Sequence, residues 1–205
     1  MQLPSDPIAE RHPWYLVMEF SSGRDDGSIN AALEAVLADG FERNLVLDAA
    51  IAQSEAQRAA FWKIREALSG AQKPEGGSIK CDISVPVSQM PAFIEKATKA
   101  VEAHVPGVRI VAFGHIGDGN IHFNPSQPVG WDRDRFLDLW DEVSTIVHGI
   151  AHDMNGSISA EHGVGRMKID EITHYKSPVE IELMRKVKRA LDPDNILNPG
   201  KVVSP

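Results

Sequence analysis

The sequence has a single cysteine, few aromatic residues and no long apolar run. Because Cys81 is alone among 205 residues, an intramolecular disulfide and a cysteine-rich zinc site are both excluded. No apolar run approaches the roughly 18 residues that a membrane-spanning helix requires, so we expect no membrane span. Residues 1–6 lack the basic and apolar regions of a secretory signal, which makes a cytoplasmic location the expectation.

Positive charge is also scarce, with 21 basic against 29 acidic side chains and a formal net charge of -8. Nucleic acids and anionic membranes disfavour a net-acidic partner, so neither is expected to bind this chain. The remaining composition, 42% hydrophobic and 24% charged, is typical of an ordinary globular protein. The length suits one sizeable domain or two small ones that share a core.

Hydrophobic periodicity predicts short strands that alternate with amphipathic helices. The predicted strands cover residues 14–20, 44–50, 79–85 and 108–113. The predicted helices cover residues 28–39, 54–70, 86–104, 131–154 and 178–191. Two of them begin with a capping-box pattern, Ser54 with Gln57 and Ser177 with Glu180. Since the hairpin described next is antiparallel, we predict an α+β fold in which helices pack on one face of a largely antiparallel sheet.

Residues 113–124, FGHIGDGNIHFN, carry the most informative pattern. If Gly117–Asn120 form the loop of a hairpin, His115 lies directly opposite His122. Directly opposed residues in an antiparallel pair have Cβ atoms about 4.5–5.5 Å apart on one face. Two imidazoles placed in this way can bind one metal ion. A cross-strand histidine pair with a merely structural role is the alternative.

A second cluster occurs at residues 157–166, SISAEHGVGR. A short strand there is predicted to bring Glu161 and His162 to its end, and the two glycines that follow let the backbone approach a ligand closely. Two histidines and one carboxylate would leave coordination positions open, as in catalytic metal sites. The alternative is an exposed Glu-His pair beside a flexible turn.

Two further groups are interpreted as surface residues on spacing alone. His148 and His152 are four residues apart on a predicted helix, but Gly149 stands where a zinc protease has its glutamate. They lie off the predicted core stripe, so we expect both to be solvated. Arg65 and Ser69 share one helix face and Lys80 begins a strand, and the residue pattern alone favours routine surface charge for these three.

Three ordered motifs, FGHIGDGNIHFN, SAEHGVGRMK and LDPDNILNPGK, resemble those of a known family. They are similar to the C-terminal domain of FAD-linked oxidases of the vanillyl-alcohol-oxidase type. That family includes dehydrogenases of D-2-hydroxyglutarate, D-lactate and glycolate. The resemblance covers nearly the whole chain, from about Trp14 onward, and residues 1–205 are expected to form this C-terminal domain. It implies a ferredoxin-like substrate-binding domain that caps a separate FAD-binding domain.

The resemblance also implies roles for individual residues. It assigns a divalent metal, usually zinc, to three ligands: His115, His122 and Glu161. It makes His162 the proposed catalytic base and places Asn124 beside the substrate. In the D-2-hydroxyglutarate branch, the positions that hold substrate carboxylates match Arg65, Ser69 and Lys80. The terminal segment that touches the flavin contains Asn198.

The family's N-terminal FAD-binding domain has no counterpart in this sequence, which lacks its glycine-rich pyrophosphate loop. We therefore expect this chain to be one part of an FAD-dependent 2-hydroxy-acid dehydrogenase. It should be inactive alone and should need an FAD domain on the same or a separate chain. The substrate is expected to be a small 2-hydroxy acid. A dicarboxylate is favoured over a monocarboxylate, because Arg65 and Lys80 supply two cations. A metal-dependent hydrolase and a non-catalytic metal- or carboxylate-binding module remain alternatives, and a homodimer is an open possibility.

Overall fold

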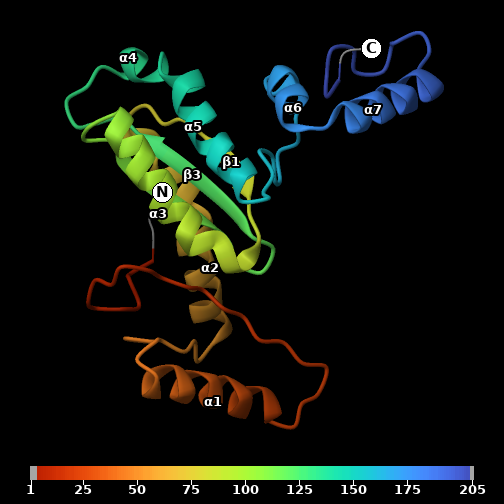
Figure 1. Ribbon diagram of the computed structural model, residues 1–205. Helices are drawn as coiled ribbons and strands as arrows, with labels where there is room; N and C mark the ends of the chain where they lie inside the picture. The colour runs from red at the N-terminus through yellow and green to blue at the C-terminus, as the bar shows by residue number, and fades with distance from the viewer. Residues whose placement is uncertain (1–3, 204–205) are drawn as a thin grey trace. The chain divides into compact units, whose positions relative to one another are not determined.

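The computed structural model describes residues 4–203. The chain divides into two compact units, Met1–Pro74 and Glu75–Pro205. Unit 1 contains two helices, α1 (Ser28–Glu42) and α2 (Glu55–Ala71) (Figure 1). A short 3₁₀ turn, η1 (Lys73–Glu75), follows α2 where the two units join.

The prediction of two strands in unit 1 is wrong. Residues 14–20 and 44–50 belong to no strand in the part of the chain that the structure describes. Their apolar side chains are largely exposed, with Trp14 at 65% and Leu47 at 64% of full exposure. A strand needs a hydrogen-bonded neighbour, and these two segments do not pair, so apolar composition was not sufficient to form one.

Helix α2 begins as its sequence indicates. The Ser54 side chain accepts a hydrogen bond from the backbone N–H of Gln57, which is the first half of a capping box. The second half differs from the prediction, because the Gln57 side chain accepts from the backbone N–H of Gln53 at 2.6 Å. The first contact satisfies a backbone N–H that the first helical turn leaves without a helical partner, and the second satisfies the N–H of the residue before the N-cap.

Unit 2 is built on a three-stranded antiparallel sheet in the order β1-β3-β2. The strands are β1 (Cys81–Ser84), β2 (Arg109–His115) and β3 (Asn120–Ser126). Helices α3 (Met90–His104) and α5 (Trp140–Asp153) pack against this sheet (Figure 1), and the short turn η2 (Val87–Gln89) leads into α3. This arrangement confirms the predicted α+β class.

One face of the sheet forms the core with α3 and α5. The residues that share this core alternate along each strand and recur on one side of each helix. They include Ile79, Cys81, Ile83, Ile121, Phe123, Phe93, Ala97, Val101, Val143 and Val147. Because successive residues of a strand point to opposite faces, the intervening residues of β1 and β3 lie on the face away from the two helices. The candidate site lies on that second face.

The order β1-α3-β2-β3-α5 matches the first five elements of a ferredoxin-like fold. In place of a fourth strand, Ser157 makes an isolated antiparallel bridge to Ser84 at the free edge of β1. Gly156 permits this approach, because a Cβ atom there would lie 2.2 Å from the Ser84 carbonyl oxygen. With the fourth strand reduced to one bridge, the ferredoxin-like assignment stays a prediction.

The prediction of a single long helix over residues 131–154 is wrong about its continuity. It is divided into α4 (Arg133–Leu137), which Asp132 caps with its side chain, and α5. At the break, the N–H of Leu139 donates to the carbonyl of Phe136, a 3₁₀-type bond that redirects the chain. Phe136 is fully buried on the near side of this break.

The C-terminal helices are α6 (Ile169–Tyr175) and α7 (Pro178–Leu191). The predicted capping box of α7 is confirmed, because Ser177 and Glu180 exchange both of its hydrogen bonds. The solvated interpretation of His148 is wrong: the residue is only 2% exposed, and its Nδ1 lies 2.7 Å from Glu171 Oε2 on α6. His152 is exposed, as predicted.

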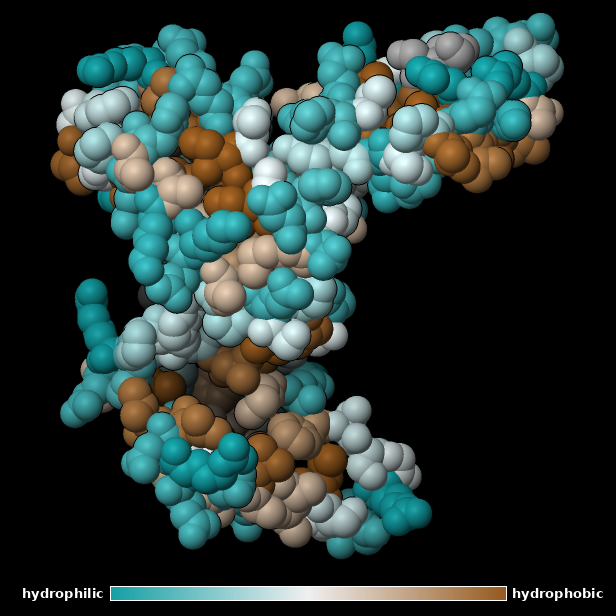
Figure 2. All heavy atoms as spheres, viewed as in Figure 1, coloured by the Kyte–Doolittle hydropathy of each residue, from teal (hydrophilic) through white to brown (hydrophobic). Residues whose placement is uncertain are grey.

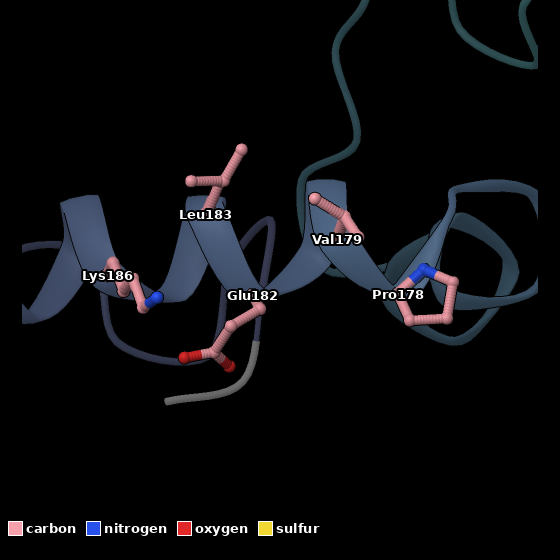
Figure 3. Close-up of a pocket in the computed structure, with 5 residues that line it drawn as sticks. All are labelled: Pro178, Val179, Glu182, Leu183 and Lys186. Carbon is pink, nitrogen blue, oxygen red and sulfur yellow. The ribbon is translucent and has the colours of Figure 1, made fainter.

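Helix α7 carries an exposed apolar stripe at four-residue intervals. Val179, Leu183, Val187 and Leu191 are each more than half exposed, and Figure 2 shows apolar residues gathered along this part of the surface. Val179 and Leu183 point to the same side of the helix above Glu182 and Lys186 (Figure 3). Among the described residues, no helix combines the length and hydropathy that a membrane span requires.

Candidate metal and substrate site

The β2–β3 hairpin differs from its predicted register by two residues. His115 pairs with Asn120 and Phe113 pairs with His122, so the predicted direct opposition of His115 and His122 is wrong. The loop covers residues 116–119 in place of the predicted 117–120, because Asn120 already belongs to β3. Gly119, at φ 75°, ends the loop, and its carbonyl accepts a hydrogen bond from the N–H of Val85. A shift of two residues preserves the face of every side chain, so His115 and His122 remain diagonal neighbours on one face.

The Glu161 side chain joins these two histidines. Its Oε1 lies 2.8 Å from His115 Nδ1, and its Oε2 lies 3.2 Å from His122 Nε2. The three side chains differ in exposure, at 51% for His115, 14% for His122 and 40% for Glu161. The site therefore opens to solvent on the His115 side while His122 is held inside.

Imidazole and carboxylate groups are ligand types of zinc sites, and the spacing of His122 and Glu161 matches such a site. Two ligands that each lie about 2.0–2.1 Å from a tetrahedral zinc ion are roughly 3–3.5 Å apart. The separation of 3.2 Å between Glu161 and His122 falls in that range, and the 2.8 Å separation from His115 is slightly shorter. Two imidazoles and one carboxylate would leave a position for substrate, as in catalytic zinc sites.

His162 lies beside this group as expected. Its ring is stacked on that of His122, with 5.7 Å between centroids, and its side chain is 64% exposed. Its Nδ1 lies 3.6 Å from Asp82 Oδ2. The exposed edge of the ring is therefore accessible to a ligand bound near His122.

Asp82 is the residue of the site that sequence reasoning missed. It is 2% exposed and pairs with His122 in the β1–β3 register. Ligand atoms of Asp82, His122, Glu161 and His162 all lie within 4.8 Å of one another, and this group does not include the predicted ligand His115. A signal was present, because Asp82 is a carboxylate in a segment that alternates as a half-buried strand, but the pairing of β1 with β3 could not be derived from the sequence.

The ionised form of Asp82 is favoured in this position. Burial alone would raise the pKa of the Asp82 carboxyl. The backbone N–H groups of His162 and Glu161 donate to Oδ2, and together with the nearby His162 ring they hold the pKa below its ordinary value. The site therefore contains a buried carboxylate that is already surrounded by donors.

The predicted substrate residues are divided between the two units. Asn124 is 5% exposed and lies two residues from His122 on β3, so both point to the same face of the sheet. Lys80 directly precedes β1, two residues from Asp82, and an extended backbone directs it to that face as well. Arg65 and Ser69 share a face of α2 in unit 1.

Asn198 lies beside α7 and is not among the residues of the histidine cluster. Its side chain accepts a hydrogen bond from Lys201 Nζ. It lines an apolar groove of about 500 Å³ between α7 and the terminal segment, together with Leu183, Val187 and Val203. The predicted contact of Asn198 with a flavin remains a prediction.

An antiparallel sheet with imidazoles and carboxylates on the face opposite its helices defines a candidate metal- and carboxylate-binding α+β domain. The model of one protein family, FAD linked oxidases, C-terminal domain, matches residues 1–202. The chain belongs to this family, which confirms the resemblance drawn from its three motifs.

Curated relatives match the chain over almost its whole length. It is 40% identical over 196 residues to a D-2-hydroxyglutarate dehydrogenase of Stutzerimonas stutzeri (strain A1501), covering 96% of this chain and 42% of that protein. It is 39% identical over 196 residues to a D-2-hydroxyglutarate dehydrogenase of Xanthomonas citri pv. viticola, covering 96% of the chain and 41% of that protein. A mitochondrial D-2-hydroxyglutarate dehydrogenase of Arabidopsis thaliana is 35% identical over 198 residues, covering 97% and 34%. The chain thus spans about two fifths or less of the length of these relatives.

Proposed function

We propose that the chain is the substrate- and metal-binding part of an FAD-dependent D-2-hydroxy-acid dehydrogenase, which oxidises a 2-hydroxy acid to a 2-oxo acid. Family membership and the names of the relatives support this proposal. The observation that carries it is the Glu161 carboxylate, which lies within 2.8 Å of His115 and 3.2 Å of His122. Open coordination positions beside a free imidazole edge suit a small chelating substrate.

In this proposal His115, His122 and Glu161 hold a divalent ion, with zinc as the best match to two nitrogen donors and one oxygen donor. When bound, the ion would polarise the hydroxyl and one carboxylate oxygen of the substrate, and FAD would accept the hydride from C2. The chain's own contribution is the placement of the reacting groups. Its sheet fixes His122, while the turn after Ser157 brings Glu161 to the same face.

His162 is proposed as the proton acceptor. Its Nδ1 faces Asp82, so Nε2 is the nitrogen that can take the proton of the substrate hydroxyl. A neutral imidazole can accept a proton near pH 7. Loss of this proton from oxygen, with departure of a hydride from C2, converts the alcohol to a ketone and balances the two-electron oxidation.

A dicarboxylate is the proposed substrate class, with D-2-hydroxyglutarate or D-malate ahead of lactate and glycolate. The metal would hold one carboxylate, which leaves Arg65 and Lys80 for a second. An arginine can bind a carboxylate through two parallel hydrogen bonds, whereas a lysine supplies a point charge. Ser69 and Asn124 would add polar contacts to the same ligand.

The flavin is proposed to lie on a separate FAD domain, in the part of the relatives' length that this chain does not span. The terminal segment with Asn198 would reach toward the flavin in the complete enzyme. The cytoplasmic location remains an expectation, because the Arabidopsis thaliana relative is named as mitochondrial. A homodimer likewise remains a prediction.

Co-expression of the chain with the segment encoded immediately upstream tests this function. We expect a yellow complex that reduces a dye with D-2-hydroxyglutarate, loses this activity to a chelator and regains it with zinc. His162→Gln should abolish turnover, while His152→Gln, on the exposed side of α5, should not. The chain alone should be colourless and silent.

Two results would redirect the proposal to the alternatives. Hydrolytic turnover by the chain without flavin would support a metal-dependent hydrolase, in which His162 activates water. A flavin-containing complex that binds metal but oxidises no 2-hydroxy acid would support a non-catalytic binding module.

A further inference from the structure

Asp82 connects three segments of unit 2 through one buried side chain. Its Oδ2 accepts hydrogen bonds from the backbone N–H groups of Glu161 at 2.8 Å and His162 at 2.9 Å. Its Oδ1 accepts from Asn120 Nδ2 at 2.9 Å, at the start of β3. The side chain therefore joins β1, the end of the hairpin loop and the segment that carries Glu161.

The same carboxylate faces two imidazoles. His122 Nδ1 lies 3.5 Å from Asp82 Oδ1, and His162 Nδ1 lies 3.6 Å from Oδ2. In His122 the opposite nitrogen, Nε2, faces Glu161 at 3.2 Å. When Glu161 and Nε2 bind an ion, the Asp82 carboxylate beside Nδ1 would be the hydrogen-bond partner of that ring nitrogen and would hold the imidazole in place.

The surroundings of Asp82 distinguish a positioning role from direct ligation. Three N–H donors already occupy its oxygens, and the side chain is only 3% exposed. Direct ligation of an ion would require it to give up backbone hydrogen bonds in a buried location, where an unpaired N–H is costly. Glu161 is 40% exposed and has no such commitment to backbone N–H groups among the described contacts.

We propose that Asp82 is a positioning residue that presets the metal site before any ion binds. It fixes the backbone at Glu161 and His162 so that both side chains face the hairpin, and it lies beside Nδ1 of His122, where it can hold the ring with Nε2 directed toward Glu161. This inference rests on the metal site of the proposed function. It adds a residue that acts through the ligands and through the base, without touching the substrate.

Asp82→Asn separates the two parts of this role. The asparagine oxygen can still accept from the backbone N–H groups of Glu161 and His162, so the fold is expected to survive. Its NH₂ group then replaces Oδ1, so the acceptor that faces His122 Nδ1 and Asn120 Nδ2 is lost. The variant therefore keeps the backbone contacts and removes the partner of the His122 ring.

Two measurements on the full 205-residue chain read out this change. In the metal-free state, backbone amide hydrogen exchange at Glu161 and His162 should be unchanged in Asp82→Asn and faster in Asp82→Ala, which removes the acceptor of both N–H groups. Zinc titration against a competing chelator should show about 10–100-fold weaker binding for Asp82→Asn, the usual effect of removing a partner of a metal-binding histidine. Asp138→Asn, at an exposed position after α4, is the matched control and should change neither.

The outcomes separate this inference from the proposed function. Amide exchange at Glu161 and His162 that is as slow in Asp82→Ala as in the original chain, or zinc affinity of Asp82→Asn within twofold of the original chain despite a lower melting temperature, would overturn the positioning role. If the original chain binds no zinc, the metal site of the proposed function fails, and the exchange measurement still decides whether Asp82 fixes the backbone at Glu161 and His162. Should Asp82→Asn fail to fold, Asn120→Ala, which removes only the donor to Oδ1, takes its place in the zinc titration, with a smaller loss of zinc affinity expected.

Discussion

Glu161 Oε1 lies 2.8 Å from His115 Nδ1, although the two residues are 46 positions apart in the sequence. The contact exists because the segment after α5 returns along the free edge of β1, where Ser157 bridges to Ser84. It brings the second histidine motif of the chain to the hairpin that carries the first.

The hairpin loop should depend on Gly119. A Cβ atom there would lie 2.0 Å from the Val85 carbonyl oxygen, and φ is +75°. We expect Gly119→Ala to lower the free energy of unfolding by about 1–3 kcal/mol through backbone strain, with a further ~1–3 kcal/mol from the clash. Urea unfolding measures the change. Gly117→Ala, in the same loop with nothing within 4 Å, is the control and should be nearly neutral; equal losses for both would contradict the loop geometry.

Arg65 should discriminate between substrates in the reconstituted enzyme. If it holds the distal carboxylate, Arg65→Ala should weaken kcat/KM for D-2-hydroxyglutarate more than for D-lactate, by about 1.5–3 kcal/mol for a lost charge-assisted contact. Lys63→Ala, at an exposed position of the same helix, is the control for the loss of one positive charge. Steady-state kinetics with both substrates gives the comparison. Equal losses on the two acids would show that Arg65 does not bind the distal carboxylate.

The contact between His148 and Glu171 should make stability depend on pH in the acid range. The His148 ring lowers the pKa of Glu171 below 4.5, against the opposing effect of partial burial. A lowered pKa means that the ionised carboxylate stabilises the fold above about pH 4.5 and that this contribution is lost as the pH falls through the folded-state value. Glu171→Gln should therefore cost about 1–3 kcal/mol at pH 7, because buried His148 loses its partner.

Free energies of unfolding at pH 7, 5, 4 and 3 test that prediction. The difference between the original chain and Glu171→Gln should shrink toward the lowest pH. Glu102→Gln, exposed on α3, should show little difference at any pH. A difference for Glu171→Gln that stays constant across the range would mean that the His148 contact does not stabilise the ionised carboxylate.

That His115 and His122 share one face of the sheet could be predicted, because the face of a strand residue depends only on whether its register shifts by an even or an odd number of residues. The predicted loop was misplaced by one residue at each end, which changed each partner but left both imidazoles on the same face. Helix starts were also predictable where a side chain makes a local bond, as Ser177 and Ser54 do. Local chemistry and periodicity therefore account for most of unit 2.

The rest depends on pairing between distant segments. Asp82 could not be assigned, because its role follows from the register of β1 against β3 and from the return of residues 157–162. His148 was wrongly predicted to be solvated for the same reason. It lies off the apolar stripe of α5, and only the structure shows that Glu171 of α6 contacts it there. Residues 14–20 show the opposite error. Their composition is typical of a strand, but no strand pairs with them among the described residues.

The metal content of the purified chain, prepared without a histidine tag, tests the central claim most directly. Elemental analysis should find about one zinc-like ion per chain, as expected for one site with two histidines and a carboxylate. His122→Ala and Glu161→Ala should lose it, whereas His152→Ala, which removes an exposed imidazole beside Tyr175, should retain it. A metal-free chain that also takes up no zinc on titration, or equal metal content in all three variants, would contradict the account.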